Sequence, residues 1–288
     1  MVNVEDKADN AEQIKYWNNK AGTVWVAQQE HLDRLLAPLS QAGLAAAKFS
    51  ANESALDIGC GCGDTSLALA VSQSNGSVTG VDISEPMLAH GKMRAASTPN
   101  LTFELADAAV AEFNSQYDLL FSRFGVMFFS NPEAAFENLR KALKPTGRMV
   151  FVCWQPPSEN PWMSLAGKAV QPFMPPATTS PNPYAPGPFA FSDPAHVLAI
   201  LTGAGFTDVQ MQSFNTPLHI ANNLDDALYF QTQIGPAANA VAILGGEEKN
   251  KALNAVKEIF RPQMTEKGLD LESAIWIVSA RNKHQASA

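Results

Sequence analysis

The sequence predicts an α/β fold, a largely parallel sheet with helices on both faces, and three observations point to it. Between residues 54 and 154, short runs of apolar and β-branched residues alternate with amphipathic stretches. The amphipathic stretches are bordered by residues that begin and end helices. Strands that alternate with helices at this spacing are joined by right-handed crossovers, which makes the strands parallel and places helices over both faces.

Five strands and three helices account for this region. The expected strands read SALDIG, SVTGVD, LTFEL, YDLLFS and GRMVFVCW, at residues 54–59, 77–82, 101–105, 117–122 and 147–154. The expected helices occupy residues 64–72, 84–97 and 131–144. We expect Asp64, Ser84 and Asn131 to be the N-caps, because side chains of these types accept hydrogen bonds from free N–H groups of the first turn.

The flanking segments differ from this region. Leucines and tryptophans at helical spacing predict a mainly helical segment before residue 50. Ten of the 19 prolines lie between Pro156 and Pro188, and this tract is expected to be neither helix nor central strand, because proline removes a donor and fixes φ. Beyond it we expect a helix at 193–205, strands at 206–214 and 271–280, and a helical insertion at about 223–265.

The composition excludes several classes of protein. The 288 residues include 20 Lys+Arg against 28 Asp+Glu, a net charge of −8, which argues against sequence-independent binding of nucleic acids. A hydrophobic content of 46% with 17% charged residues excludes a disordered chain. Three cysteines, no apolar leader and no apolar run long enough for a membrane helix favour a reduced, cytoplasmic protein without a membrane span.

A glycine-rich turn is the most informative motif. Gly59, Gly61 and Gly63 follow a buried strand and precede a helix, so the backbone can turn sharply and approach a ligand. A dinucleotide site would use G-x-G-x-x-G and place pyrophosphate on the helix N-terminus. Here the third glycine comes one residue early, and a carboxylate at Asp64 would repel pyrophosphate. Asp57, at the end of the strand, also favours a cation, so a nucleoside with a positively charged tail fits better; S-adenosylmethionine (SAM) is one.

The segment ALDIGCGCGDT resembles the first motif of the class I SAM-dependent methyltransferases. Similarity over most of residues 11–215 extends to a bacterial subgroup that acts on small molecules and, more distantly, to ubiquinone and menaquinone methyltransferases. The resemblance implies a Rossmann-like, doubly wound sheet of seven mostly parallel strands with the last strand antiparallel. We further expect an N-terminal helical cap at 1–50 and a SAM-binding domain at 51–288, in which 155–192 and 223–265 cover the substrate; in the resembled family these two segments vary with the substrate, so the resemblance itself implies nothing about them.

Two further acids follow the next two strands. Asp82 is placed to accept hydrogen bonds from ribose hydroxyls, a role that dinucleotide and SAM sites share. In the resembled family, the position of Asp107 contacts the adenine amino group, and Ala106 and Ala108 contribute backbone contacts. Taken alone, Asp107 is more typical of a helix cap.

The segment after the fourth strand borders the methionine part of the cofactor in the resembled family. Arg123 stands out there, because an arginine in an apolar run needs an anionic partner. The candidates are the SAM carboxylate, a substrate acid, Asp57 or Asp118. The residues expected to contact the cofactor are Asp57, Gly59, Cys60, Gly61, Gly63, Asp82, Ile83, Met87, Ala106, Asp107, Ala108, Ser122, Arg123, Phe124, Trp17 and Trp25.

The predicted reaction is methyl transfer from SAM to a small, apolar or aromatic molecule, with S-adenosylhomocysteine (SAH) as product. Such an in-line displacement needs alignment and exclusion of water more than a general base. His31, His219, Tyr16 and Tyr184 are weak candidates for a base, and no catalytic residue is assigned. Two interpretations stay open for a set of aromatic residues, a roof over an apolar cavity or ordinary core packing, of which the second is more typical of scattered aromatics. The set is Tyr16, Trp17, Trp25, Phe128, Trp154, Trp162, Phe173, Tyr184, Phe189 and Phe191.

Several alternatives stay open. A protein that binds SAM without catalysis would keep the same glycines and Asp82, and an NAD-dependent oxidoreductase is a weaker fit to the spacing. No metal site is expected, because Cys60 and Cys62 lie in a turn already assigned to a nucleoside and zinc needs further ligands. The helical insertion at 223–265 is a candidate for a lid or for the surface of a homodimer.

Overall fold

The computed structural model of the protein describes residues 10–73, 75–113, 117–175 and 182–282. The chain forms two compact units: residues 1–154, 183–214 and 275–288 make up the first, and residues 155–182 and 215–274 the second. The first nine residues of the expected N-terminal cap and residues 176–181 of the proline-rich connection lie outside the described residues.

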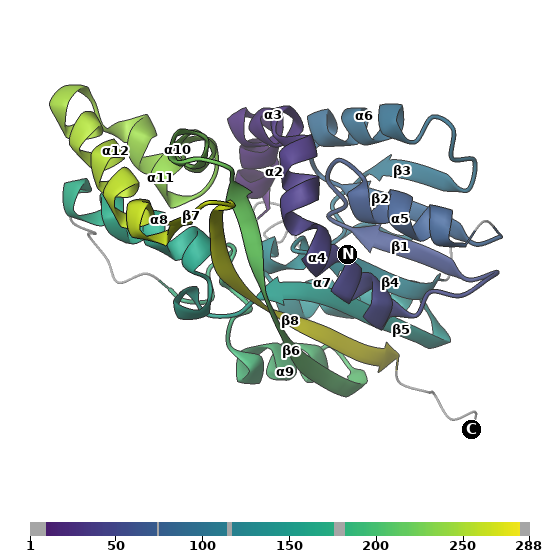
Figure 1. Ribbon diagram of the computed structural model, residues 1–288. Helices are drawn as coiled ribbons and strands as arrows, with labels where there is room; N and C mark the ends of the chain where they lie inside the picture. Colours follow the sequence, from purple (N-terminus) through teal and green to yellow (C-terminus); the bar gives the residue numbers. More distant parts are fainter. Residues whose placement is uncertain (1–9, 74, 114–116, 176–181, 283–288) are drawn as a thin grey trace. The chain divides into compact units, whose positions relative to one another are not determined.

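The first unit is built on the sheet, and the predicted fold class is confirmed. The strands follow the order β3-β2-β1-β4-β5-β8-β6 (Figure 1). Pairing is parallel from β3 across to β5, and β8 runs antiparallel to β5, with Cys153 opposite Trp276. The strands are β1 (Ser54–Ile58), β2 (Ser77–Asp82), β3 (Leu101–Leu105), β4 (Tyr117–Arg123), β5 (Leu143–Trp154), β6 (Phe206–Ala221) and β8 (Gly268–Asn282).

Helices cover both faces of this sheet (Figure 1). On one face, α4 (Gln29–Ala47) packs on β4 and β5, α5 (Asp64–Ser72) on β1 and β2, and α6 (Glu85–Arg94) on β2 and β3. On the other, α7 (Pro132–Ala142) packs on β5 and against α9 (Pro194–Gly203). Two short helices, α2 (Ala11–Asn18) and α3 (Lys20–Ala27), precede α4, and α3 lies beside α6.

The ends of two helices differ from the prediction. Gly63, with φ of 80°, is the N-cap of α5, so Asp64 is the first helical residue instead of the cap. Asn131 caps α7 as expected, and its side chain accepts from the N–H of Ala134 at 3.2 Å. However, α7 ends at Ala142 and β5 begins at Leu143. The reason is Pro145, which disfavours helical backbone at Lys144 and cannot continue the hydrogen-bond ladder.

The first unit has an aromatic core on one side of the sheet. Phe136 of α7 contacts Phe151 of β5 with ring centroids 5.6 Å apart and Phe191 with centroids 6.0 Å apart. All three rings are buried. Of the two interpretations for Phe191, the structure supports core packing, where the ring contributes hydrophobic stabilisation.

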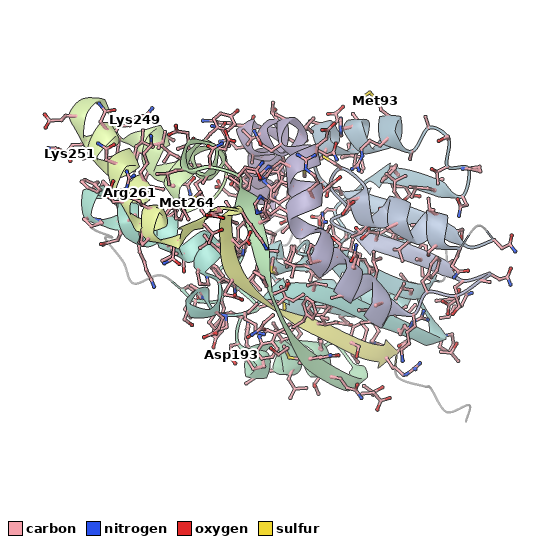
Figure 2. All side chains as sticks on the ribbon, viewed as in Figure 1. Met93, Asp193, Lys249, Lys251, Arg261 and Met264 are labelled. Atoms are coloured by element: carbon pink, nitrogen blue, oxygen red, sulfur yellow. The ribbon has the colours of Figure 1, made fainter. Side chains whose placement is uncertain are left out.

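The second unit is mainly helical. It contains α8 (Pro161–Val170), α10 (Leu224–Gln233), α11 (Pro236–Ile243), α12 (Gly246–Phe260) and the short strand β7 (Met264–Thr265), which pairs with β8. The three helices α10 to α12 fill the expected insertion. Lys249 and Lys251 of α12 and the following Arg261 project outward, as Figure 2 shows.

Helix α8 contradicts the expectation that the proline-rich connection holds no helix. Pro161 lies in the first turn of α8, where a missing N–H costs nothing, and no proline follows until Pro172. The buried side chain of Asn160, just before the helix, donates to the carbonyl oxygens of Gln155 and Ala274 at 3.0 Å and accepts from the N–H of Ala274 at 3.0 Å. These bonds connect the start of α8 to β8 within the second unit.

Candidate functional site

The glycine-rich turn after β1 is folded against the end of β2. Gly59, Gly61 and Gly63 all have positive φ, of 65°, 55° and 80°, which side chains with a Cβ rarely adopt. The N–H groups of Gly59 and Cys60 donate to the carbonyl oxygen of Val81 at 2.8 and 3.1 Å. A Cβ on Gly61 would meet only the sulfur of Met87 within 4 Å, at 3.8 Å. The backbone at Gly61 therefore borders open space in which a ligand can approach closely.

The loops that follow β1 and β4 touch at two glycines. A Cβ on Gly59 would lie 2.7 Å from the Cα of Gly125, and a Cβ on Gly125 would lie 2.9 Å from the Cα of Gly59. Because both strands end at the same edge of the sheet, this contact holds the glycine-rich turn next to the segment that begins at Ser122. The Ser122 hydroxyl reinforces it by donating to the carbonyl oxygen of Ile58 at 2.7 Å.

Asp57 is a fully buried carboxyl at the end of β1. Its Oδ2 accepts from the hydroxyls of Thr65 and Ser66 at 2.8 and 2.6 Å. Its Oδ1 has no hydrogen-bond partner among the described residues. Burial raises the pKa of Asp57 to about 6, and the two hydroxyl bonds and the positive charge of Arg123 only partly oppose this. The site thus contains a carboxyl oxygen, Oδ1 of Asp57, that has the capacity to accept a further hydrogen bond.

Asp82, at the end of β2, accepts hydrogen bonds from the turn after β1 and from the turn after β2. Its Oδ2 accepts from the N–H of Gly61 at 2.8 Å, and its Oδ1 accepts from the N–H of Ser84 at 2.8 Å. The carboxyl is buried, and this burial raises its pKa although the backbone hydrogen bonds lower it. A buried acid held by N–H groups on both sides has a fixed orientation, which suits recognition of hydroxyl groups.

Asp107 follows β3 and caps the turn after it. Its Oδ1 accepts from the N–H of Ala109 at 3.0 Å, which is the capping role considered for it. Its Oδ2 accepts from the side chain of Asn10, just before α2, at 2.6 Å. Ala106 donates its N–H to the carbonyl oxygen of Asp82 at 3.1 Å, which brings the ends of β2 and β3 together.

Arg123 pairs with an acid that the sequence did not indicate. Its Nη1 lies 2.7 Å from Oδ2 of Asp64 and 2.7 Å from the hydroxyl of Ser40 in α4. Both structural partners considered for it were wrong: Asp57 is bonded to Thr65 and Ser66, and Asp118 pairs with Lys144 at 2.8 Å. The guanidinium needs a partner because it is largely buried, and Asp64 supplies one at the start of α5.

Phe124 is held in an unusual backbone conformation beside Arg123. Its φ is 62°, which is rare for a residue with a side chain. The ring stacks on Trp154 with centroids 4.0 Å apart and planes 4° apart. This stack fixes an aromatic pair at the edge of the sheet where β4 and β5 end.

Comparison with known proteins agrees with this geometry. Residues 55–147 match a family model described as a methyltransferase domain. Over 169 residues the chain is 32% identical to a demethylmenaquinone methyltransferase of Staphylococcus epidermidis, an alignment that covers 56% of this chain and 70% of that protein. The chain belongs to the class I SAM-dependent methyltransferases. It is therefore a methyltransferase with SAM as methyl donor and SAH as product.

Two other similarities have a narrower scope. A demethylmenaquinone methyltransferase of Staphylococcus aureus is 37% identical over 98 residues, which span 33% of this chain and only 41% of that protein. The crystal structure of the YcgJ protein of Bacillus subtilis superposes with a TM-score of 0.56 at 16% identity, covering 85% of this methyltransferase and 97% of that chain. At that identity the structural similarity shows the fold alone.

The N-terminal helices of this methyltransferase reach the loops after β2 and β4. Trp17 of α2 contacts Trp25 of α3 and Phe128 edge-to-face, with ring centroids 5.8 and 5.3 Å apart. The carbonyl oxygen of Trp17 accepts from the hydroxyl of Ser84 at 2.8 Å. Asn18 donates to the carbonyl oxygen of Ile83 at 2.7 Å and accepts from the N–H of Glu85 at 2.9 Å. The structure thus brings Trp17, Trp25 and Ile83 close to the other predicted residues.

The two cysteines in the turn are protonated thiols. Cys60 is buried, and burial raises its thiol pKa well above the ordinary value. Burial likewise raises the pKa of Cys62 to about 12, although Arg94 opposes the shift. Neither thiol is therefore an activated nucleophile at neutral pH.

Three of the four candidate bases, His219, Tyr184 and Tyr16, are engaged elsewhere or exposed. His219, in the second unit, has Nδ1 at 2.7 Å from Asp270 and Nε2 at 3.1 Å from the side-chain oxygen of Asn222. Two acceptors favour the charged ring, and the Asp270 contact raises the His219 pKa most, so this ring is a poor base. Tyr184 donates to Asp193 at 3.1 Å and stacks on His196, and Tyr16 is 56% exposed. None of these contacts indicates a proton acceptor for the reaction.

Several polar residues around the turn were missed. Asn10, Asn18, Ser40 and Asp64 all contact predicted site residues or the loops beside them. In the sequence they look like ordinary residues at helix ends or on helix surfaces, and no motif includes Asn10, Asn18 or Ser40. Asp64 was singled out as an N-cap and as a charge that repels pyrophosphate, but not as the partner of Arg123.

Arg94 adds one more link between the cap and the turn. It donates to the carbonyl oxygen of Cys62 at 2.7 Å and pairs with Asp33 of α4 at 2.7 Å. Gln29 also donates to Asp33, so this acid is held by two partners. Arg94 and Arg123, the two cations described beside the glycine-rich turn, are therefore each paired with an acid.

Proposed function

We propose that the loops at the carboxyl ends of β1 to β4 bind SAM and that the enzyme methylates a small, apolar or aromatic molecule. The observation that carries this is the open backbone of the glycine-rich turn beside the buried acids Asp57 and Asp82. Glycines at positive φ leave room for close approach, and the acids suit a ligand with hydroxyl donors and a positive charge.

Each part of the cofactor has a counterpart in this arrangement. Asp82 is assigned to the ribose hydroxyls, and Asp107 with Ala106 and Ala108 to the adenine. Ser122, Arg123 and Phe124 are assigned to the methionine part of the cofactor. The turn residues Gly59, Cys60, Gly61 and Gly63 are assigned to the same part. Ile83 and Met87 flank the nucleoside, and Trp17 and Trp25 close it from the cap. The unpartnered Oδ1 of buried Asp57 supports the assignment, because an unsatisfied acceptor in such a place is costly unless a ligand or water meets it.

The bound cofactor supplies a methyl group on a positively charged sulfur, which is already activated for displacement. The protein then has to align the acceptor and keep water away. Trp17, Trp25 and Phe128 offer an apolar, water-excluding wall next to the loop after β4. A general base is needed only where the nucleophile of the acceptor is protonated at neutral pH, and we assign no residue to that role.

An aromatic acceptor is supported by this wall and by the relatives. The demethylmenaquinone methyltransferases carry a quinone in their name, and the alignment with one of them reaches 70% of its length. The edge-to-face rings of Trp17, Trp25 and Phe128 present faces and edges against which a planar ring packs favourably.

The experiment that tests the cofactor site is calorimetric titration of the full chain with SAH and, separately, with NAD. We expect tight SAH binding and no NAD binding. Asp82→Ala should weaken SAH binding by about 1–3 kcal/mol, because it leaves hydroxyls unpaired in a buried site. Glu137→Ala, on the exposed side of α7, is the control and should bind SAH like the wild type. Tight binding of NAD without SAH, or an unchanged affinity in Asp82→Ala, contradicts the proposal.

A further inference from the structure

The inner side of α2 carries polar groups that the cap itself does not use. Asn10, Gln13 and Trp17 are three and four residues apart, so they lie on one side of the helix. Asn10 contacts Asp107 at the end of β3, and Trp17 contacts Ser84 after β2 and Phe128 after β4. This side of α2 therefore follows the edge of the sheet on which the nucleoside site is proposed.

The orientation of the Asn10 carboxamide is fixed by Asp107. The carboxylate oxygen at 2.6 Å accepts a hydrogen bond, so the group that faces it must be the Nδ2 amide. The carbonyl Oδ1 is bonded to the same carbon as Nδ2, so it lies beside this contact. Asn10 is only 9% exposed, and its Oδ1 is buried with no hydrogen-bond partner among the described residues.

This unpartnered oxygen has no structural task in α2. Asn10 is the N-cap by position, but its side chain makes no hydrogen bond to the first turn. Gln13, one turn further, also has a buried Oε1 without a partner in the described chain. A buried acceptor without a donor costs free energy, and two of them on one side of a helix point to a donor-bearing ligand.

We propose that Asn10 adds a second acceptor, beside the Asp107 position that contacts adenine in the family, for the exocyclic amino group of the adenine of SAM, and so increases the preference for adenosine over other purine nucleosides. The inference rests on the proposed SAM site. Oδ2 of Asp107 and Oδ1 of Asn10 are neighbouring acceptors, because the latter belongs to the carboxamide that contacts the former. A primary amino group has two N–H donors and matches two adjacent acceptors. A ring carbonyl in the same place would face two oxygens and be repelled.

The test compares two ligands that differ only at that group: SAH and S-inosylhomocysteine, in which a carbonyl replaces the amino group. Calorimetric dissociation constants are measured for the full-length wild type, Asn10→Ala and Asn10→Leu. We expect the wild type to prefer SAH at least about tenfold, a difference of one lost hydrogen bond. In both variants SAH binding should weaken about tenfold while S-inosylhomocysteine binding changes about twofold or less, so discrimination falls.

Controls separate recognition from folding and from the wider proposal. Lys15→Ala, on the exposed side of α2, should retain wild-type discrimination. Thermal melting without ligand shows whether the Asn10 variants are folded, and Asn10→Leu preserves the side-chain volume if the alanine variant is unstable. A wild type that binds SAH, with variants that keep its affinity and discrimination, overturns the role of Asn10. A wild type that binds neither ligand overturns the SAM site itself.

Discussion

Buried acids are the main feature of the site at the scale of single residues. Asp57 and Asp82 are both enclosed at the ends of adjacent strands, yet their surroundings differ. Asp82 accepts two backbone N–H groups, whereas Asp57 accepts two hydroxyls through one oxygen and keeps the other unpartnered. Burial raises the pKa of both, and raises that of Asp57 to about 6. Asp57 therefore reduces stability near neutral pH when no ligand is present.

The pH dependence of the unfolding free energy tests whether Asp57 reduces stability near neutral pH. An acid whose pKa is higher in the folded state makes stability fall as pH rises, here between the unfolded value near 4 and the folded value of about 6. Asp57→Asn removes this titration. The difference in unfolding free energy, variant minus wild type, should therefore increase by up to about 3 kcal/mol between pH 4 and pH 7. Urea denaturation without ligand at a series of pH values measures the difference. Parallel curves for the two proteins would show that Asp57 does not titrate as described.

At the scale of elements, close packing of short helices holds the cap in place. Gly22 of α3 lies against the start of α6: a Cβ there would clash with the carbonyl oxygen of Trp17 and come within 2.8 Å of the Ser84 hydroxyl and 3.1 Å of the Pro86 ring. In an unconstrained helix, alanine is more stabilising than glycine by about 1 kcal/mol. The packing at Gly22 should reverse that preference.

We therefore expect Gly22→Ala to destabilise the protein by about 1–3 kcal/mol in urea denaturation, because overfilled contacts force helices apart. The matched control is Gly187→Ala, where the added Cβ would meet only the carbonyl oxygen of Ala185 at an ordinary 3.7 Å. That variant should lie within about 0.5 kcal/mol of wild type. A stabilised Gly22→Ala variant would refute the close approach of α3 to α6.

The sequence predicted elements well where local signals decide them. The strand, glycine turn and helix from β1 to α5 follow from residue spacing alone, since positive φ at three positions demands glycine. Predictions that relied on composition over a long stretch were less accurate. Proline content suggested an irregular connection, but α8 forms because one proline is in its first turn and the next ten residues contain none. Similarly, α7 ends at Ala142 because Pro145 acts on the residue before it.

For the whole molecule, charge bears on the choice of acceptor. The chain carries a net charge of −8, and the charges at the site are buried acids or cations already paired with acids. A polyanionic acceptor would find no free cluster of cations among these groups, and phosphate contacts dominate nucleic-acid affinity. Among the described residues, no helix is long and apolar enough to cross a membrane.

We therefore expect methyl transfer from labelled SAM to small aromatic acceptors, such as phenols and hydroquinones, and none to tRNA, rRNA or DNA. Product formation is followed by label transfer and by release of SAH. The Glu137→Ala variant again serves as control and should turn over like the wild type. Turnover on nucleic acid alone would contradict the proposed acceptor class, and SAH binding without turnover of any acceptor would favour a non-catalytic role for the site.

Between residues 54 and 154, the sequence by itself determined the order of strands and helices, the glycine turn and the acids that follow successive strands, because each depends on residues close together in the chain. Only the tertiary structure decided which side chains meet. Arg123 pairs with Asp64 across 59 positions and Asn10 with Asp107 across 97. Such pairs depend on which strands are neighbours and on how the N-terminal helices pack on their ends. No local sequence pattern predicts these pairs, because a buried charged group pairs with whichever complementary side chain the fold places beside it.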